Sequence, residues 1–283
     1  MPELPEVQTI INDLNEKIAG DTITGFWSDW PKTIKGMKLA DFEKQIKNKK
    51  ILKARRIGKN IFIDLSGGKT IYIHLKMTGH LLVKSENTKT KNYFNERVNQ
   101  YVHHIWKLGK SKTLEFSDLR KFGKIMLVDT DKVGELKEIK ELGIDVADKK
   151  FTFDKFQEIL NKKLNVPIGV LLMDQNLLSG IGNIYRSEIL FEAGISPFRK
   201  VRDVSLDERR KIYQAIGKVL KRAIKLRGTS DSDYRDTSGA PGGFQKVLKV
   251  YNRENEVCKK CEGRVKREKL GGRSVFFCEK CQS

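Results

Sequence analysis

The chain has 283 residues, of which 39% are hydrophobic and 33% are charged, with both signs interspersed, which excludes an intrinsically disordered protein. No apolar run reaches the ~18 residues that span a bilayer and the start lacks the features of a signal peptide, so we expect a cytoplasmic protein without a membrane partner. The 56 Lys and Arg residues exceed the 36 Asp and Glu residues by 20, which favours a nucleic-acid partner, although a lysine-rich proteome would give a similar balance.

The first part of the chain combines one helical pattern with several strand patterns. Residues 6–19 have helical spacing of apolar positions and stop at Gly20, a residue typical of helix C-termini. Period-two alternation predicts strands at 60–65, 70–75, 113–116 and 124–128, and Ser66, Gly67 and Gly68 predict a hairpin turn. We therefore expect a strand-rich first domain over 1–131.

The pattern changes after this domain. Residues 132–150 form a charged stretch that we interpret as a linker. Helical patterns follow at 153–161, 169–175, 183–193 and 206–226, the last with start signals at Ser205, Asp207 and Glu208. The polar loop 228–244 closes this helical domain, which we place at 151–245. A loop of that length indicates a functional segment, with surface slack as the alternative.

Residues 246–283 contain every cysteine of the chain. Cys258 and Cys261 form one pair, and Cys278 and Cys281 form the other. This spacing is typical of a four-thiolate zinc site, and because no ligand position remains open we predict a structural zinc ion. Arg273 follows two glycines that permit a tight turn, a placement that favours phosphate binding, although it could be a solvated surface charge.

The amino terminus is a candidate nucleophile. Removal of Met1 would leave Pro2 as a secondary amine, and an α-amino group has a pKa of about 7.7–8.0, so part of it is neutral at cellular pH. A neutral amine can attack an electrophilic sugar carbon and form a Schiff base. Glu3 and Glu6 lie close enough in sequence to transfer protons, although most glutamates are merely solvated.

Six segments together resemble the formamidopyrimidine-DNA glycosylase family, and the match keeps its order from residue 2 to residue 282. They include the Met-Pro-Glu-Leu-Pro-Glu start, the His-Leu-Lys-Met-Thr-Gly turn at 74–79 and the Ser-Asp-Leu-Arg-Lys-Phe-Gly loop at 117–123. The remaining segments are 57–60, 172–195 and 271–282.

The resemblance implies an α+β multidomain fold. It comprises an N-terminal β-sandwich with an N-terminal helix, a helical domain with a helix–two-turn–helix segment, and a β-hairpin zinc finger. It also implies a monomeric, bifunctional DNA glycosylase and AP lyase that acts on damaged double-stranded DNA in the bacterial cytoplasm, associated with the nucleoid. Such an enzyme removes 8-oxoguanine and formamidopyrimidines through a Schiff base and cleaves the strand by β,δ-elimination.

The resemblance also implies roles for individual residues. The catalytic residues would be Pro2, Glu3, Lys59 and Arg273, with Glu6 in support. Phosphate contacts would come from Lys59, His74, Asn183 and Arg273, drawn from both halves of the chain as expected for a cleft between domains. Met77, Arg120 and Phe122 would fill the gap left by the extruded base, and Tyr234, with Thr229 and Ser230, would contact that base.

Two positions depart from the family pattern. Gly169 stands where many members have a lysine that has been tied to handling the oxidised purine, and Arg186 is more similar to the endonuclease VIII branch. Leu4 favours the formamidopyrimidine branch. Two alternatives therefore remain open: an endonuclease VIII-type glycosylase for oxidised pyrimidines, and a non-enzymatic zinc-ribbon protein that binds nucleic acid.

Overall fold

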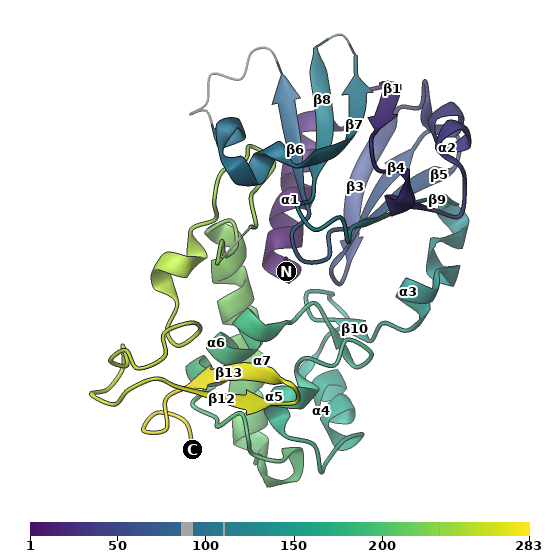
Figure 1. Ribbon diagram of the computed structural model, residues 1–283. Coiled ribbons are helices and arrows are strands. Elements are labelled where there is room, and N and C mark those ends of the chain that lie inside the picture. The colour runs from purple at the N-terminus through teal and green to yellow at the C-terminus, as the bar shows by residue number, and fades with distance from the viewer. Residues whose placement is uncertain (86–92, 110, 232) are drawn as a thin grey trace. The chain divides into compact units, whose positions relative to one another are not determined.

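The computed structural model describes residues 1–85, 93–109, 111–231 and 233–283 (Figure 1). The chain forms two compact units. The first contains Met1–Lys140 and Leu226–Gln245, and the second contains Glu141–Lys225 and Lys246–Ser283. The structure thus differs from the predicted boundaries. The loop 228–244, which the sequence pattern groups with the helical domain, packs within the first unit, as does the part of the predicted linker up to Lys140. The segment 246–283, predicted as a separate zinc finger, is grouped with the helical domain.

Helix α1 (Leu4–Ile18) opens the first unit. Glu3 is its N-cap residue, Pro5 lies in its first turn and Gly20 adopts a left-handed φ of +94° just beyond its end. The structure confirms the predicted helix and starts it two residues earlier, because proline is tolerated in a first turn, where the N–H has no intrahelical partner. Its buried apolar side chains recur at helical spacing: Leu4, Val7, Ile10, Ile11, Leu14 and Ile18.

Two sheets form the β-sandwich of the first unit. The four-stranded sheet is antiparallel, in the order β1 (Ile23–Ser28), β7 (Val102–Leu108), β8 (Lys112–Ser117) and β6 (His80–Ser85). The order in the five-stranded sheet is β2 (Ile34–Lys35), β9 (Lys124–Asp129), β5 (Lys69–His74), β4 (Asn60–Leu65) and β3 (Ile51–Ile57). In the second sheet only β2 and β9 pair in parallel.

The main core of this unit lies between the sheets and α1, with α2 (Leu39–Ile46) packed against it. The five-stranded sheet is also covered on its other face, where Phe62 and Tyr72 contact Val133 of the 3-10 helix η4 (Thr130–Glu135). Burial on both faces explains why β4 is buried along its entire length. Shorter helices complete the unit: η1 (Pro31–Thr33), η2 (Tyr93–Asn95), η3 (Arg97–Gln100) and α3 (Lys137–Lys140).

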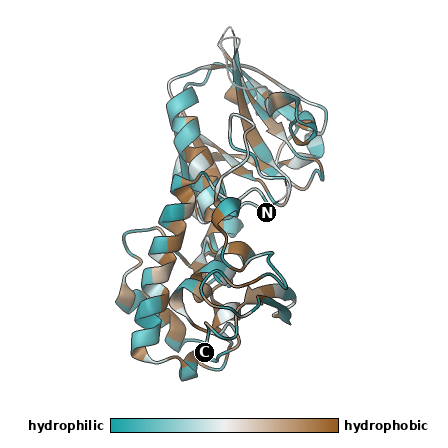
Figure 2. Ribbon diagram, turned by 90° about the vertical axis from the view of Figure 1, so that its left-hand side faces the viewer, coloured by the Kyte–Doolittle hydropathy of each residue, from teal (hydrophilic) through white to brown (hydrophobic). Residues whose placement is uncertain are grey.

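The second unit is helical, and its predicted helices are confirmed with small changes at their ends. Helices α4 (Phe153–Asn161) and α6 (Asn183–Ala193) have the predicted bounds, and α7 (Leu206–Lys225) ends one residue early. The helix predicted at 169–175 is the short α5 (Ile168–Leu171), followed by turns that lead to α6. The helices of both units alternate between hydrophobic and hydrophilic segments, as expected for helices with one buried face (Figure 2).

Four strands and two 3-10 helices complete the second unit and its junctions. β10 (Ile144–Asp145) pairs in parallel with β11 (Leu178–Ser179), and β12 (Lys266–Leu270) pairs with β13 (Arg273–Phe277) as an antiparallel hairpin. The 3-10 helices are η5 (Val201–Asp203) and η6 (Phe244–Val247). This is the α+β architecture expected from the sequence.

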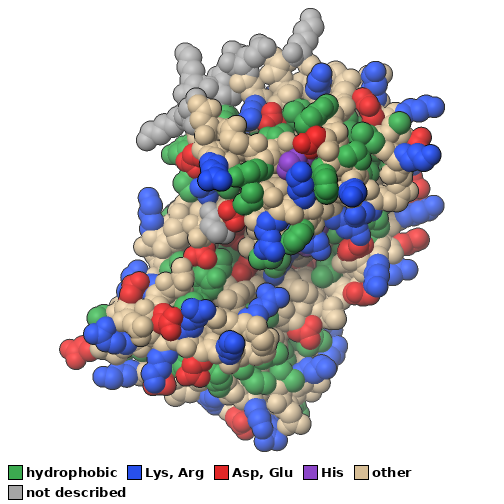
Figure 3. All heavy atoms as spheres, viewed as in Figure 1, with side chains coloured by type: hydrophobic (Ala, Val, Ile, Leu, Met, Phe, Trp, Pro, Cys, Tyr) green, Lys and Arg blue, Asp and Glu red, His purple; other side chains and the backbone are tan. Residues whose placement is uncertain are grey.

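The charged surface and the polarity of the helices agree with the amino-acid composition. Lys and Arg side chains are spread across the visible face in Figure 3, with acidic side chains between them. Among the described residues, no helix is both long enough and apolar enough to cross a membrane.

Candidate active site and nucleic-acid interface

A buried carboxylate joins the N-terminal segment to the loop 228–244. Glu6 is 1% exposed, and its Oε2 accepts the backbone N–H of Glu3 at 2.8 Å. Its Oε1 accepts the backbone N–H of Thr229 at 2.7 Å. Pro2 and Glu3 are themselves buried, whereas Met1 is 43% exposed. The candidate nucleophile and its neighbouring carboxylates therefore lie at the start of a helix fixed to the loop.

Gly228 allows this close approach. Its φ of +82° lies in the left-handed region, and a Cβ added there would lie 2.7 Å from Glu6 Oε1. Any L-residue with a side chain would meet both backbone strain and a steric clash. The contact between Glu6 and Thr229 therefore depends on a glycine at position 228.

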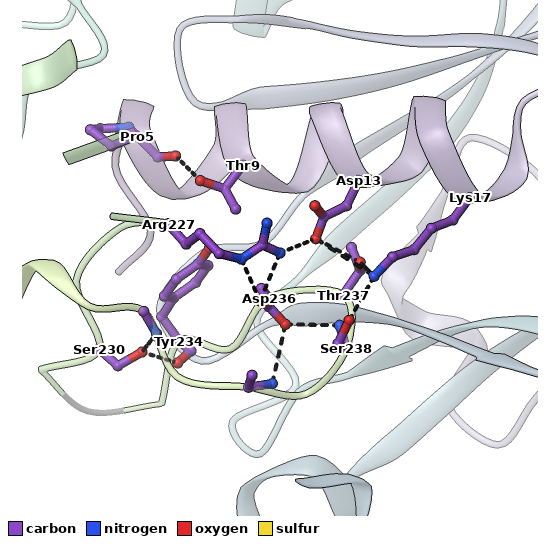
Figure 4. A network of polar contacts seen from close by, with 12 residues as sticks. Pro5, Thr9, Asp13, Lys17, Arg227, Ser230, Tyr234, Asp236, Thr237 and Ser238 are labelled. Atoms are coloured by element: carbon purple, nitrogen blue, oxygen red, sulfur yellow. Dashed lines mark hydrogen bonds and ion pairs between the residues drawn. The ribbon is translucent and has the colours of Figure 1, made fainter. Parts of the chain in front are cut away.

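A second polar cluster anchors the far part of the loop to α1 (Figure 4). Asp13 accepts hydrogen bonds from Arg227 Nη2 at 2.6 Å and from Thr237 Oγ1 at 2.8 Å. Arg227 Nε also donates to Asp236 at 2.8 Å, and Lys17 Nζ donates to Thr237 Oγ1 at 2.7 Å. The buried side chains at the centre of the cluster are Asp13, Asp236 and Thr237. This part of the loop is therefore a packed element of the first unit rather than surface slack.

Tyr234, predicted to contact an extruded base, has its ring in the main core and is 5% exposed. Its Oη has no hydrogen-bond partner among the described residues. Burial raises the pKa of Tyr234 well above its usual value, and the nearby Glu6 and Asp236 carboxylates raise it further, so the phenol is neutral. A direct contact with a base would require this ring to move.

Two other loop residues were predicted to contact the base. Thr229 is buried, and Ser230 donates from Oγ to the carbonyl of Tyr234 at 2.6 Å. Ser232, in the same loop, lies outside the described residues.

Lys59 and His74 lie on adjacent parts of the five-stranded sheet. Lys59 is 7% exposed in the turn between β3 and β4, and His74 is the last residue of β5. Burial lowers the pKa of His74 to about 4, and the positive charges of Lys76 and Lys59 lower it further. The backbone N–H of Lys76 donates to His74 Nδ1 at 2.9 Å, so the neutral ring carries its proton on Nε2. His74 thus offers an uncharged N–H donor beside a lysine, an arrangement suited to phosphate binding.

The three residues predicted to fill the gap in the duplex lie together. Met77 is 46% exposed and Phe122 is 53% exposed. Arg120 connects them, because its Nη1 lies 3.1 Å from Met77 Sδ and its guanidinium carbon lies 4.6 Å from the centre of the Phe122 ring. Two exposed apolar side chains around a planar cation form a surface able to stack on bases.

Buried polar contacts hold the two loops that carry these residues. Asp118 accepts hydrogen bonds from the hydroxyl of Thr78 and, at 2.7 Å, from the backbone N–H of Gly123. Thr78 Oγ1 in turn accepts the backbone N–H of Arg120 at 3.1 Å. These bonds join the turn after β5 to the loop after β8, and only the tertiary structure reveals them.

In the second unit, Asn183 is the first residue of α6 and Arg273 is the exposed first residue of β13. Gly271 and Gly272 have φ angles of +58° and +76°, which confirms the predicted tight turn before Arg273. Arg186, noted in the sequence only as a departure from the family, donates to Asn183 Oδ1 at 2.6 Å. No sequence pattern indicates that this arginine is buried, because a fully buried arginine is rare.

The four cysteines form one cluster in the second unit. Their sulfur atoms all lie within 4.8 Å of one another, and the 258–281 and 261–278 pairs are 3.8 and 3.6 Å apart. A zinc ion with zinc–sulfur bonds of ~2.3 Å requires sulfurs about 3.8 Å apart at the corners of a tetrahedron. The cluster therefore fits one structural zinc ion with no open ligand position.

Three family models match the chain in succession. The formamidopyrimidine-DNA glycosylase N-terminal domain matches residues 1–125, and the formamidopyrimidine-DNA glycosylase H2TH domain matches residues 142–235. The zinc finger found in FPG and IleRS matches residues 255–283.

Full-length relatives agree with these matches. The formamidopyrimidine-DNA glycosylase of Pelotomaculum thermopropionicum is 39% identical over 282 residues, covering 100% of this chain and 99% of the relative. That of Carboxydothermus hydrogenoformans is 38% identical and covers 100% of both chains.

Solved structures extend the likeness to three dimensions. The complex between Lactococcus lactis Fpg and DNA containing an abasic site has a TM-score of 0.87 at 28% identity, covering 100% of both chains. MutM bound to DNA containing carbocyclic 8-oxo-G has a TM-score of 0.86 with the same identity and coverage. On these matches, the chain belongs to the formamidopyrimidine-DNA glycosylase family.

Proposed function

We propose that this chain is a bifunctional DNA glycosylase and AP lyase that excises oxidised purines, with the amine of Pro2 as nucleophile. The observation that carries the proposal is the link from the backbone N–H of Glu3 through the buried Glu6 carboxylate to Thr229, which ties the residue next to Pro2 to the loop. The exposure of Met1 supports its removal by an aminopeptidase. Relatives in the family are bound to damaged DNA in solved structures, including Lactococcus lactis Fpg with an abasic site.

The chemistry follows from a neutral secondary amine. The Pro2 nitrogen forms a bond to C1′ while the glycosidic bond breaks, and the departing base takes up a proton. The C1′–O4′ bond then opens to an iminium ion, with Glu3 delivering the proton to O4′. The iminium acidifies the C2′ proton, whose removal expels the 3′ phosphate. Loss of a second proton, from C4′, expels the 5′ phosphate, and water hydrolyses the iminium ion to restore the amine.

The remaining residues would bind and distort the DNA. Lys59, His74, Asn183 and Arg273 would contact phosphates, and Met77, Arg120 and Phe122 would occupy the space of the extruded base. Base extrusion costs a few kcal/mol, part of which these stacking contacts offset. The enzyme would act as a monomer on damaged duplex DNA in the bacterial cytoplasm, associated with the nucleoid.

Covalent trapping tests the proposal. Full-length protein with a free Pro2 terminus is incubated with an 8-oxoguanine:cytosine duplex and borohydride, which reduces a Schiff base to a stable adduct. We expect a protein–DNA adduct that disappears when the terminal amine is blocked and forms more slowly in Pro2→Gly and Glu3→Gln. Glu16→Gln, an exposed carboxylate on the same helix, is the matched control and should react like the parent.

Other substrates separate the alternatives. An adduct with a thymine glycol duplex but none with 8-oxoguanine would indicate an endonuclease VIII-type glycosylase for oxidised pyrimidines. If no adduct formed on 8-oxoguanine, thymine glycol or abasic duplexes, the proposed function would be wrong. The protein would then be a zinc-ribbon protein that binds DNA without reacting with it.

A further inference from the structure

Arg186 is among the largest fully buried side chains of the described residues, at 1% exposed. Arginine is almost never fully buried unless its charge is paired and hydrogen-bonded, because removing the guanidinium from water is costly. Arg186 is buried because it lies in α6 within the segment Ile184–Phe191, all of whose residues are buried. An interior arginine therefore requires a dedicated set of acceptors.

The guanidinium contacts three separate segments of the second unit. Its Nη2 donates to Asn183 Oδ1 at 2.6 Å and to the carbonyl of Ser274 at 2.9 Å. Its Nη1 lies 3.3 Å from the carbonyl of Gly169. The fixed planar arrangement of arginine N–H groups allows one side chain to bind α5, the start of α6 and β13 together.

Gly169 makes this arrangement possible. A Cβ added to Gly169 would lie 2.9 Å from Leu270 Cδ2 and 2.9 Å from the carbonyl oxygen of Pro197. The backbone of α5 is therefore packed directly against the hairpin, with no space for a side chain at this position. The two departures from the family pattern, Gly169 and Arg186, are thus parts of one packed contact.

This contact bears on the two proposed phosphate-binding residues of the unit. Because Asn183 Oδ1 accepts a hydrogen bond from Arg186, the rotation of the amide is fixed and its NH₂ group is left as the donor. The Ser274 carbonyl directly follows Arg273 in β13, so the hydrogen bond to it fixes the strand from which Arg273 projects. Phosphate oxygens accept hydrogen bonds from donors of both kinds.

We propose that Arg186 is a positioning residue, which orients the Asn183 amide and the strand that carries Arg273, so that Asn183 and Arg273 bind the DNA backbone together. The inference rests on the proposed function, since it takes Asn183 and Arg273 as phosphate contacts. Arg186 itself is too deeply buried to reach a phosphate. Its effect must therefore appear through these two side chains.

The test uses Arg186→Lys, which keeps the charge but removes the planar set of donors. Binding of a duplex with a tetrahydrofuran abasic analogue is measured over a range of salt concentrations, and zinc content and thermal unfolding confirm that the variant is folded. We expect Kd to rise about 10-fold, as for loss of charge-assisted hydrogen bonds. We also expect the slope of log K against log salt to fall by about one, as if the Arg273 contact were lost.

The Arg186→Lys, Arg273→Ala double variant makes the test specific. If Arg186 acts through Arg273, the double variant has the same salt slope as Arg273→Ala alone. Arg199→Lys is the matched control, because its guanidinium also bonds a carboxylate and backbone carbonyls, from Glu208, Asp203 and Ser283. This control should leave DNA binding unchanged. A folded, zinc-loaded Arg186→Lys protein with parental affinity and slope would overturn the proposal.

A second measurement does not depend on the folding of an Arg186 variant. Asn183→Ala and Arg273→Ala are compared singly and together with Arg186 intact. Positioning by a shared residue predicts that their effects on Kd are coupled, so that the double variant differs from the product of the single effects. A simple product would refute the inference. If the parent protein itself neither binds the abasic duplex nor forms the adduct, the proposed function fails, whereas a reactive parent with uncoupled variants rejects only the role of Arg186.

Discussion

The carboxylate of Glu6 and the backbone N–H of Thr229 form a hydrogen bond of 2.7 Å across 223 residues of sequence. The same carboxylate accepts the N–H of Glu3, the residue after the candidate nucleophile. The helix start and the loop are therefore coupled through one side chain, and several variants should reveal this coupling.

Glu6→Gln should impair both stability and reaction. The amide replaces one acceptor oxygen with an NH₂ group, which leaves one of the two backbone N–H donors without an acceptor and the other bonded to a neutral oxygen. Hydrogen bonds to charged groups contribute about 1.5–3 kcal/mol, so we expect a loss of that order in unfolding free energy together with slower adduct formation. Chemical denaturation and borohydride trapping measure the two effects. Parental values for both would show that the coupling has no consequence.

Gly228→Ala should be destabilising, and Gly217→Ala should be stabilising. At 228 the new Cβ would meet Glu6 Oε1 at 2.7 Å in a left-handed conformation, whereas 217 is an exposed position of α7 with no atom within 4 Å of the new Cβ. We expect a loss of about 1–3 kcal/mol at 228 and a gain of about 0.5–1 kcal/mol at 217. Thermal unfolding of the two variants provides the comparison. Equal shifts in the same direction would contradict the assigned geometry.

Asp13→Asn should loosen the anchored end of the loop. Asp13 is the acceptor shared by Arg227 and Thr237, and loss of its charge leaves the cation with Asp236 alone in this cluster. Breaking a partly buried network of this kind should cost about 1–3 kcal/mol and increase proteolysis within 228–244. Asp131→Asn, an exposed carboxylate of the same unit, is the control and should have little effect on either measurement.

Acidification should destabilise the first unit through its neutral histidines. Burial lowers the pKa of His74, His80 and His104 to about 4 in each case. The unfolded chain therefore binds their protons first as the pH falls below the ordinary value of about 6.5. Stability contributed by the neutral rings is complete above pH 6.5 and is lost progressively toward pH 4.

His80→Gln isolates one of these contributions. His80 Nε2 lies 2.9 Å from Asn99 Oδ1, and the amide of glutamine can supply a donor without titrating. We expect a shallower decrease in unfolding free energy between pH 6.5 and pH 4.5 than in the parent. An unchanged slope would exclude His80 as a source of the acid sensitivity.

Zinc removal should disorder the hairpin and weaken DNA binding while the β-sandwich persists. Without the ion, no metal bonds join the two cysteine pairs, and the hairpin strand β13 carries Arg273. We expect loss of about 10-fold or more in affinity for an abasic duplex after chelation, with recovery when zinc is restored. Zinc release and DNA binding are followed together. Full affinity in zinc-free protein would show that the hairpin is not required.

Much of the fold follows from local patterns in the sequence. The helices at 153–161 and 183–193 were predicted with their observed bounds, because apolar spacing and capping residues act locally. Strands β3 and β7 were missed, since charged residues and histidines interrupt their alternation, and their pairing with neighbouring strands decides their conformation.

The sequence alone determined the four-cysteine cluster, the strongly basic balance and the Pro2-Glu3 start, because each depends on residue type and short spacing. Tertiary structure decided which loops meet. It placed 226–245 with the first unit, buried the ring of Tyr234 and brought Arg186 to Ser274. These contacts join residues far apart in the chain, and whether a polar side chain is solvated or buried depends on the neighbours that folding supplies.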